Sequence, residues 1–430
     1  MAYRSYLIAS LLIGLMVGLI QPVLAEVDIG GSARLRYEDK INFNLADAEQ
    51  DYFLTQLRLH LDWKASTNNH VYVQLQDARV IGESREDIPS INDKARNQPF
   101  ADKLDIHQLY YVRKWGGGEI KLGRQKFNLG DMRLVASLEW VNTARVHDGV
   151  RVTFGDDKGR KIDTFASRMV SVDPDGLNDQ ATSNNRYFDS EFHGVFVADK
   201  SIISNSELQY WYFLRDNDDF DDSIHTFGSR FLTKIRKWSF DVQGAAQTGQ
   251  FNGLDHNAYM VHMGADINVF GGNLGFGYNH ASGDSDNSDG DHATFDNLYP
   301  LNHAYYGFMD LFSLQNIHNA EAVFKMGLGS KAKLRFAYQG FWLADTNDAW
   351  YNAGLAGNGS RLTSALAVKD AGNDVDPYVG SEIDITVKYP LTKKWILMGG
   401  YSHFFSGSYT SETGQSNDAD FLFIMTKMSF

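Results

Sequence analysis

Beyond residue 25, side chains of this 430-residue chain alternate between apolar and polar with a period of two. In one such segment Leu57, Leu59 and Leu61 alternate with Arg58 and His60. The same alternation recurs in residues 71–76, 238–243, 259–267, 333–339 and 382–389. Because successive side chains of a strand point to opposite faces, each segment is predicted to be a β-strand with one apolar and one polar face. No later apolar run is long enough for a membrane-spanning helix.

About 18 strands are predicted, and their connections alternate between short and long. The strands are centred near residues 30, 55, 72, 108, 122, 148, 164, 193, 210, 228, 242, 264, 277, 322, 336, 385, 400 and 425. The short connections include residues 65–69, 115–118, 155–159, 271–272 and 329–330. The long connections include residues 78–103, 171–187, 283–316 and 343–378, which are rich in Asp, Asn, Gly and Ser.

This layout is typical of an outer-membrane barrel, which joins an even number of strands by short turns at one end and long loops at the other. Closing the sheet also removes the edge that lipid does not tolerate. The predicted fold class is therefore all-β: a transmembrane antiparallel β-barrel with short periplasmic turns and long extracellular loops. A secreted soluble sandwich, the alternative, gives no reason for sorting its loops in this way.

The N-terminal residues have the pattern of a secretory signal peptide. Arg4 precedes a nearly continuous apolar run from Leu7 to Ile20, and Ala25 ends a plausible cleavage site. A membrane anchor helix is the alternative, but the run of about 14 residues is shorter than the roughly 20 that span a bilayer. We therefore predict a cleaved signal peptide at residues 1–25 and a single barrel domain at residues 26–430, in the bacterial outer membrane.

The chain ends in an apolar and aromatic segment, residues 421–430, whose last residue is Phe430. In the plainest interpretation this is the last strand. It also resembles the terminal signal, ending in Phe or Trp, by which barrel proteins are recognised for assembly. The resemblance implies the outer-membrane assembly machinery as a partner through Phe430.

Composition and motifs exclude several classes of function. With 40 Lys and Arg against 54 Asp and Glu, a net charge of −14 and no basic block, the chain is not expected to bind nucleic acid. It has no Cys, and no G-x-S-x-G or His-Glu-x-x-His motif. Ser402 and His403 are sequence neighbours on a predicted strand, so they point to opposite faces and cannot act as a dyad. We predict no enzyme, no catalytic residues, no bound metal and no cofactor.

Two acidic segments, residues 216–222 and 284–291, leave one alternative open. Their carboxylates are dense enough for Ca²⁺, which takes six to eight oxygen ligands. Their spacing does not match the helix–loop–helix calcium pattern, and no helices are predicted beside them. Solvated surface loops are the favoured interpretation.

A block of the sequence resembles a known family. It consists of Leu122-Gly123-Arg124-Gln125, Leu129-Gly130-Asp131-Met132-Arg133-Leu134, Trp140-Val141-Asn142 and Arg145-Val146-His147-Asp148-Gly149-Val150-Arg151-Val152. This block resembles the central signature of the alginate-export family of outer-membrane barrels. The stretch Phe295–Pro300, with His303, Tyr306-Gly307 and Asp310, is similar to another part of that family. The resemblance implies a monomeric 18-stranded barrel with a basic lumen that passes an anionic uronic-acid polysaccharide.

Arginine is the side chain best suited to such a lumen, because guanidinium pairs with carboxylates in a bidentate and permanently charged way. Several moderate sites lower the barrier to an anion and still let it leave. By parity, the inward arginines are Arg34, Arg36, Arg58, Arg145, Arg151, Arg230 and Arg335. The family-like block adds Arg124, Arg133 and Asp148 as pore-lining candidates. Inward acids offer an alternative, a structural salt-bridge lattice: Asp62, Asp105, Asp241, Asp266, Glu321, Glu382 and Asp384.

Two of these candidates break the parity of their strands. With Leu122 and Val150 facing outward, Arg124 and Asp148 also face lipid, where an arginine costs roughly 2 to 4 kcal/mol. Either bulges at the neighbouring glycines restore the parity, or both residues lie beyond the hydrocarbon edge. We favour bulges, which would turn both side chains into the lumen.

The sequence therefore favours a channel for an anionic polysaccharide, an alginate-like polyuronate or related anionic carbohydrate. The alternative is a general or substrate-specific porin for small solutes, and an adhesin-like or enzymatic barrel ranks last. The expected partners are the anionic polysaccharide or a small anionic solute, and outer-membrane lipid. Loops 78–103 and 343–378 are long enough to fold inward as gates.

Overall fold

The computed structural model describes residues 26–42, 45, 47–82, 100–170, 187, 190–286, 288–353, 360–361, 375–414 and 416–430. The predicted signal peptide lies outside the described residues. So do residues 83–99 of the first predicted gate loop, and residues 354–359 and 362–374 of the second.

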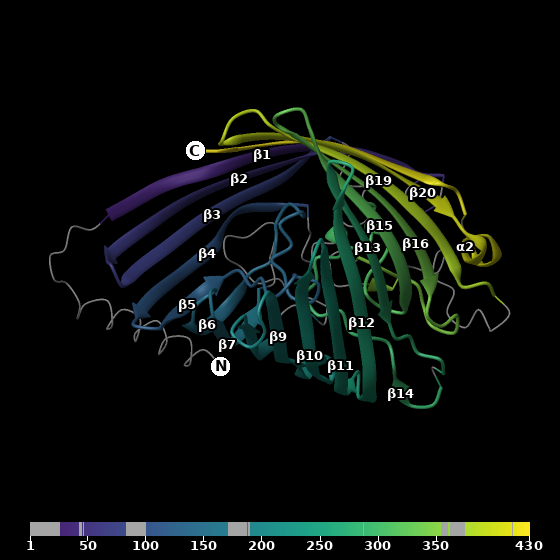
Figure 1. Ribbon diagram of the computed structural model, residues 1–430, viewed down its shortest axis with the longest axis horizontal. Coiled ribbons are helices and arrows are strands. Elements are labelled where there is room, and N and C mark those ends of the chain that lie inside the picture. The colour runs from purple at the N-terminus through teal and green to yellow at the C-terminus, as the bar shows by residue number, and fades with distance from the viewer. Residues whose placement is uncertain are drawn as a thin grey trace.

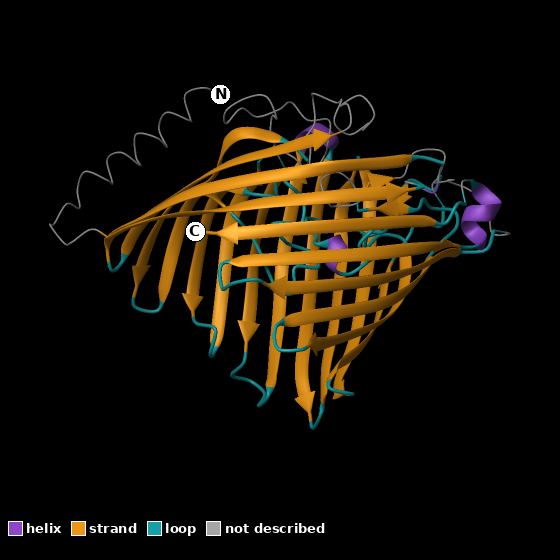
Figure 2. Cartoon of the chain, turned by 90° about the horizontal axis from the view of Figure 1, so that it is seen from above, coloured by secondary structure: helices purple, strands orange, loops and turns teal. Residues whose placement is uncertain are grey.

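Eighteen antiparallel strands form one closed wall, which Figures 1 and 2 show from two directions. The barrel strands are β1 (Glu26–Ile41), β2 (Glu49–Ser66), β3 (Asn69–Gly82), β4 (Asp102–Trp115), β5 (Gly118–Gln125), β6 (His147–Gly155), β7 (Arg160–Met169), β8 (Glu191–Asp199), β9 (Ser206–Asn217), β10 (Asp222–Ile235), β11 (Trp238–Phe251), β12 (Leu254–Val269), β13 (Gly272–Ala281), β15 (Ile317–Leu328), β16 (Ala332–Leu343), β19 (Tyr378–Pro390), β20 (Trp395–Ser406) and β21 (Ala419–Ser429). Each pairs with its neighbours along the chain, and β1 pairs with β21 to close the ring. All the predicted strand positions lie within these strands, so the predicted fold class is confirmed.

Short elements occupy the connections at the loop end. They are β14 (Asp291–His292), β17 (Tyr351–Asn352), β18 (Ser360–Arg361), the 3₁₀ turns η2 (Asp218–Phe220) and η3 (Asn302–Ala304), and the helix α2 (Ser408–Thr413). In the described part of the chain, no helix has the length and apolar character needed to cross a membrane.

The wall places apolar side chains outside and polar ones inside. On β2, Leu57 and Leu59 are 43% and 46% exposed on the outer face, whereas Arg58 between them is 3% exposed. This arrangement suits a lipid bilayer, because the apolar outer face contacts lipid tails. In addition, the backbone groups of a closed sheet are hydrogen-bonded within the sheet and need no water.

The two ends of the barrel differ in their connections. The turns at one end are short throughout, for example residues 116–117 and 236–237. Most connections at the other end are long, but two are short, residues 218–221 and 252–253. We call these the turn end and the loop end. In Figure 1 the C-terminus lies at the turn end and α2 at the loop end.

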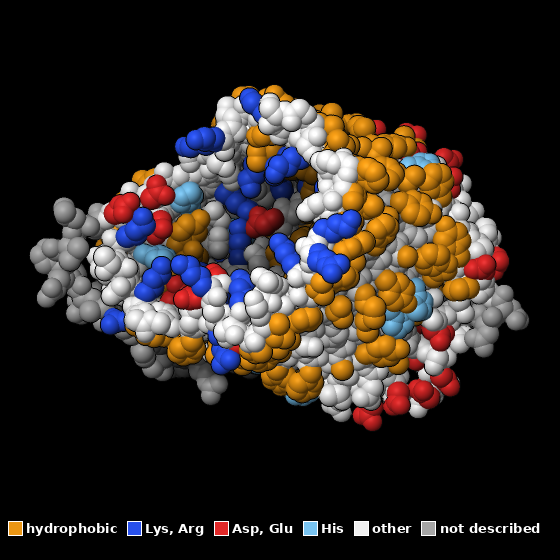
Figure 3. Space-filling view, viewed as in Figure 1, with side chains coloured by type: hydrophobic (Ala, Val, Ile, Leu, Met, Phe, Trp, Pro, Cys, Tyr) orange, Lys and Arg blue, Asp and Glu red, His pale blue; other side chains and the backbone are white. Residues whose placement is uncertain are grey.

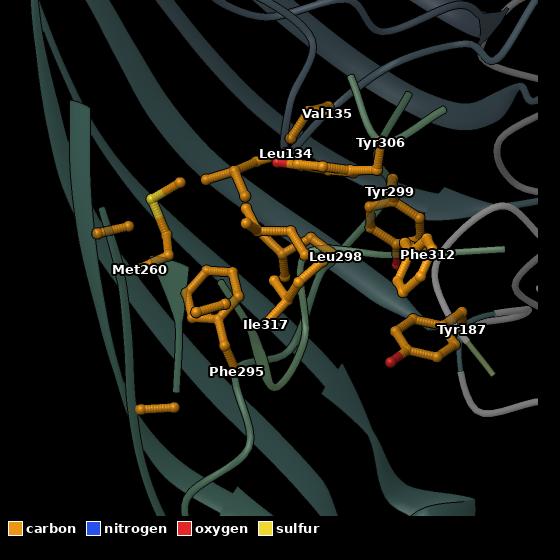
Figure 4. Close-up of a cluster of buried hydrophobic side chains, with 14 of the residues drawn as sticks. Leu134, Val135, Tyr187, Met260, Phe295, Leu298, Tyr299, Tyr306, Phe312 and Ile317 are labelled. Carbon is orange, nitrogen blue, oxygen red and sulfur yellow. The ribbon is translucent and has the colours of Figure 1, made fainter. Parts of the chain in front are cut away.

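Two of the long connections fold into the barrel. The first inner loop (residues 126–146) folds back on itself through a bridge of Leu129 to Val135, and Val135 also bridges to Tyr299 of the second inner loop (residues 282–316). Their apolar side chains pack against inward aromatic residues of the wall, such as Phe192, to form the main hydrophobic core. Figure 4 shows this core, with Met260 projecting into it from β12. The core therefore lies inside the loop-end half of the barrel.

Candidate functional site

Two arginines of β1 hold the first inner loop against the inner wall. Arg34 donates through Nη1 to the carbonyl oxygen of Glu139 at 2.9 Å, and through Nη2 to Oδ1 of Asn142 at 3.0 Å. Arg36 donates through Nη1 to the carbonyl oxygen of Trp140 at 2.6 Å. Both arginines face inward, in agreement with parity, and their donors fix a loop inside the bore.

The carboxylate of Glu139 lies among several cations. Arg58 Nη1 is 2.6 Å from Oε2 of Glu139, and Lys126 Nζ is 2.6 Å from Oε1. Lys427 on β21 lies directly opposite Arg34 in the strand register and so faces the same side. Enclosure by the barrel raises the pKa of the Glu139 carboxyl, but the charges of Arg58 and Lys126 outweigh that effect and hold the pKa well below its usual range. Glu139 is therefore ionised, and 43% of its side chain is exposed.

Trp140 joins β1 to the second inner loop. The Arg36 guanidinium lies 4.1 Å from the centroid of the Trp140 ring, and His303 stacks on that ring at 3.9 Å. Phe308 and Phe423 pack edge-on against the same ring, with centroids 5.8 and 5.1 Å away. These contacts give the first inner loop a single position between the wall and the second inner loop.

Arg133 and Arg145 belong to the first inner loop, not to strands. Arg133 Nη1 donates to Oδ1 of Asn279 on β13 and to the hydroxyl of Tyr306, both at 2.9 Å. Arg145 is 4% exposed and donates to carbonyl oxygens, including that of Pro300 at 3.0 Å. Both side chains crosslink the inner loops and are buried in the packed half of the barrel.

Three further arginines project inward from strands, and each lies beside an acid of a neighbouring strand. The pairs are Arg151 with Asp163 at 2.8 Å, Arg230 with Asp241 at 2.5 Å, and Arg335 with Asp384 at 3.5 Å. The arginine side chains remain 17%, 11% and 19% exposed. These arginines therefore combine the two interpretations of the sequence: they belong to a salt-bridge lattice and still border the bore.

Arg124 and Asp148 form an ion pair on the outer face. Arg124 lies opposite Leu109 and Asp148 in the strand registers, and its guanidinium donates to both carboxylate oxygens of Asp148 at 2.9 and 3.0 Å. The register between β5 and β6 has no shift at Gly123 or Gly149. The favoured prediction, that bulges at these glycines turn both side chains into the lumen, is therefore wrong.

The position of this pair explains why its charges are tolerated. Arg124 is the last residue but one of β5, and Asp148 is the second of β6, so both lie at the loop end of the wall. Mutual pairing neutralises the charges there. Gly149 is required for a different reason, because a Cβ at this position would lie 2.3 Å from the carbonyl oxygen of Ala166.

A cavity of about 850 Å³ opens on the wall at the turn end, lined by residues of β12, β13, β15, β16, β19 and β20 and of the turn between β12 and β13. Its cations are Lys325, Lys333, Arg335 and Lys388, and no acid is among the described residues that line it. Figure 3 shows a hollow on one face of the molecule, with many Lys and Arg side chains and fewer Asp and Glu side chains in and around it. The three lysines have the same inward parity as Arg335, but they are not among the predicted pore-lining residues, which were chosen for the bidentate pairing of arginine.

A second cavity of about 690 Å³ lies at the turn end of β4 to β7. Its cations are Lys114, Lys121, Arg151 and Lys161, but Glu119, Asp156 and Asp157 line it too. β5 and β15 are nine strands apart in either direction around the barrel, so the two cavities lie on opposite sides of the bore. The first cavity therefore differs from the second in having no acid among its described lining residues.

Each of the two acidic segments, residues 216–222 and 284–291, includes a buried carboxylate. Asp222 is buried in an ion pair with Arg215 at 3.0 Å, and Asp284 is 5% exposed, so neither segment is wholly a solvated loop. Among the residues that the structure describes, no group of three or more His, Cys, Asp or Glu is arranged to hold a metal ion.

Ser402 and His403 point to opposite faces of β20. The Ser402 hydroxyl donates to Oδ1 of the inward Asp384 at 2.6 Å, whereas the His403 ring contacts Asp420 at 2.7 Å. The two side chains have separate partners and do not form a dyad.

Several solved structures share this fold, and one of them, OpdK, is an outer-membrane protein. OpdK from Pseudomonas aeruginosa matches with a TM-score of 0.63 and 10% identity, over 94% of this chain and 98% of that one. OccAB2 and OccAB1 from Acinetobacter baumannii match with TM-scores of 0.65 and 0.64, at 11% and 12% identity, over 94% of this chain and 98% and 96% of theirs. A comparison with curated proteins finds no match.

The sequence itself matches the family model described as alginate export over residues 25–423, nearly the whole chain. Family and fold are those of transport channels, and an outer-membrane location agrees with the lipid-adapted wall. This chain therefore belongs to the alginate export family and is an outer-membrane channel.

Proposed function

We propose that this channel passes an anionic carbohydrate, namely an alginate-like polyuronate, through the basic turn-end half of its bore. The proposal depends on one observation, the turn-end cavity with four cations and no lining acid among the described residues. A polyuronate carries one carboxylate per sugar, so a cavity of this size can meet more than one carboxylate at once. Membership of the alginate export family supports the same cargo.

A substrate-specific porin for small anionic solutes is the second candidate. It is favoured by the two inner loops, which pack inside the loop-end half of the barrel and are crosslinked by Arg133 and Arg145. Loops inside a bore take up part of its cross-section, which suits a small solute better than a polymer.

Single-channel current in planar bilayers separates the two candidates. The probes are oligouronates of increasing length and neutral oligosaccharides of the same lengths. Under the leading proposal, block by uronates strengthens with each added sugar, because each carboxylate adds a contact. Equal block by a monouronate and by longer chains favours the small-solute porin. Equal block by neutral and acidic sugars contradicts an anionic cargo.

Two triple variants with equal loss of charge test the cavity. The cavity variant carries Lys325→Gln, Lys333→Gln and Lys388→Gln. The control carries Lys331→Gln, Lys393→Gln and Lys394→Gln, three exposed lysines of the turns that do not line the cavity. We expect the uronate concentration for half block to rise by about tenfold in the cavity variant alone, since three exposed charges contribute on the order of 1.4 kcal/mol together. An equal rise in both variants contradicts a specific site.

The biogenesis proposed for the chain has its own tests. Signal peptide cleavage predicts that the protein from outer membranes begins at Glu26 by N-terminal sequencing. Recognition through Phe430 predicts that Phe430→Gly lowers the yield of folded barrel in cells but not refolding in detergent. A monomer predicts no crosslinked dimer in outer membranes; crosslinking between copies contradicts it.

A further inference from the structure

We propose that Arg34, Arg58, Lys126 and Lys427 form a carboxylate-binding subsite in the bore, and that Glu139 occupies it as an internal competitor of the cargo. The inference rests on the proposed function, because the ligand it names is a carboxylate such as that of a uronate. It adds a specific residue that sets how tightly the channel holds its cargo.

The geometry gives Glu139 the contacts that a bound carboxylate makes. Its two oxygens are each 2.6 Å from a different cation, Oε2 from Arg58 and Oε1 from Lys126. Arg58 is held in place by its Nε, which donates to Oε1 of Gln76 at 2.8 Å. Arg34 donates to the backbone carbonyl of Glu139 and so positions the same residue from β1. A strand residue, Arg58, and a residue of the same inner loop, Lys126, thus meet at one carboxylate, while Arg34 holds the backbone beside it.

The subsite has binding capacity beyond its internal carboxylate. Arg58 Nη2 is buried and has no hydrogen-bond partner among the described residues. An unpartnered guanidinium nitrogen in an enclosed site favours an additional anion, because a buried donor without an acceptor is costly. A cargo carboxylate can reach this donor once the Glu139 side chain has moved aside.

Positive charge exceeds negative charge at the subsite. Burial lowers the pKa of Lys126, and the charges of Arg58 and Lys427 lower it further, while Glu139 opposes the shift. Cations that destabilise one another in this way gain from any carboxylate that approaches, so removal of Glu139 increases the demand for an external one.

Competition by Glu139 explains how binding and release are balanced. Cations without a competing carboxylate hold a polyanion for longer, whereas conduction requires both entry and exit. When a cargo carboxylate displaces Glu139, one charge-assisted pair replaces another of the same kind, so the exchange changes the free energy little. The side chain of Glu139 is 43% exposed and can move aside into the bore.

Current block of the full-length reconstituted channel by acetate and by an oligouronate tests this proposal. Glu139→Gln keeps the size of the side chain and removes its charge. We expect half block by each probe at a concentration at least about tenfold lower, with longer block events, because one competing charge-assisted pair is gone. Glu139→Asp, which keeps the charge, is expected to retain block within about twofold of the wild type.

A matched control is Glu119→Gln, the same chemical change at an inward acid of β5 outside the subsite. An equal gain in Glu119→Gln shows a general field effect and overturns the proposal, as does no gain in Glu139→Gln. The double variant Glu139→Gln, Arg58→Gln is expected to lose the gain. A gain that persists without Arg58 also overturns the proposal.

Acetate separates this inference from the proposed cargo. If acetate block strengthens in Glu139→Gln but neutral and acidic sugars block the wild type alike, the subsite stands and the cargo proposal fails. If acidic sugars block selectively in the wild type but Glu139→Gln changes nothing, the cargo proposal stands and the subsite fails.

Discussion

Individual arginines inside this barrel differ in how completely they are enclosed, and that decides what their removal costs. Arg215 is fully buried, 3.0 Å from Asp222 and 2.7 Å from Asp296. Arg215→Met leaves two buried carboxylates without their counter-charge. We expect it to lower the free energy of unfolding by about 3–5 kcal/mol, measured by denaturant unfolding of the barrel in detergent micelles.

The comparison for Arg215 is Arg168, which pairs with Glu191 at 3.3 Å while both side chains are about half exposed. Arg168→Met is expected to cost at most about 1 kcal/mol, because an exposed ion pair is screened by solvent. Equal losses for the two variants contradict the assignment of Arg215 to an enclosed lattice.

The outer-face pair of Arg124 and Asp148 gives a second prediction for single residues. Arg124→Leu alone leaves Asp148 without its bidentate donor and is expected to lower the free energy of unfolding by roughly 1–3 kcal/mol. Arg124→Leu combined with Asp148→Leu is expected to restore most of that loss, since a lipid-adapted face accepts leucine. A double-mutant cycle in detergent micelles measures this coupling. If the two losses simply add, the pair is not an isolated unit on the outer face.

The strands of this chain are more predictable than its connections, for a physical reason. One face of each strand contacts lipid, so apolar residues such as Leu57 and Leu59 must alternate with inward polar ones. This alternation is visible in the sequence. Inside the barrel, the same parity correctly placed Arg34 and Arg335. It could not show that Arg34 binds carbonyl oxygens of an inner loop or that Arg335 lies beside Asp384, because these partners depend on the shear between strands and on loops that cross the bore.

The inner loops were hidden from this reasoning because a connection has no fixed period. Only their composition indicated that they fold inward, because Phe295, Leu298 and Tyr299 are apolar or aromatic, whereas a solvated loop is expected to have polar residues. All three are fully buried in the core. An exposed connection has no use for such side chains. The glycines next to Arg124 and Asp148 led to a wrong prediction of bulges. Gly149 is instead needed because the neighbouring strand lies too close for a Cβ atom.

Docking of the first inner loop gives a prediction at the scale of an element. Asn142 is fully buried, and its Nδ2 donates to the carbonyl oxygens of Thr55 at 3.0 Å and Phe100 at 2.7 Å. Asn142→Ala removes these hydrogen bonds and is expected to weaken docking by on the order of 2 kcal/mol. The loop then leaves its position more often, which raises mean single-channel conductance and current noise. Asn68→Ala, in a turn, is the control; equal effects in both variants contradict a docking role.

Charge is distributed unequally between the two ends of the whole molecule. The chain carries a net charge of −14, yet the turn end has a cavity lined by four cations. Exposed acids of the loop end include Asp218, Asp219, Asp221, Asp286, Asp289 and Asp291. A polyanion is therefore attracted at the turn end and repelled at the loop end. Since a passive channel has no motor, this asymmetry affects the rate of entry and not the equilibrium.

The asymmetry predicts a sided response to a polyuronate in planar bilayers with oriented channels. Polymer added on the turn side is expected to block with a higher association rate than polymer added on the loop side. The difference should shrink as KCl rises from about 0.1 M to about 1 M, because the Debye length falls from about 10 Å to about 3 Å. A neutral polymer of equal length is the control and should show no salt-dependent sidedness. Equal association rates from both sides at low salt mean that the acidic loop end does not repel the polymer, and the turn end is then not its preferred entrance.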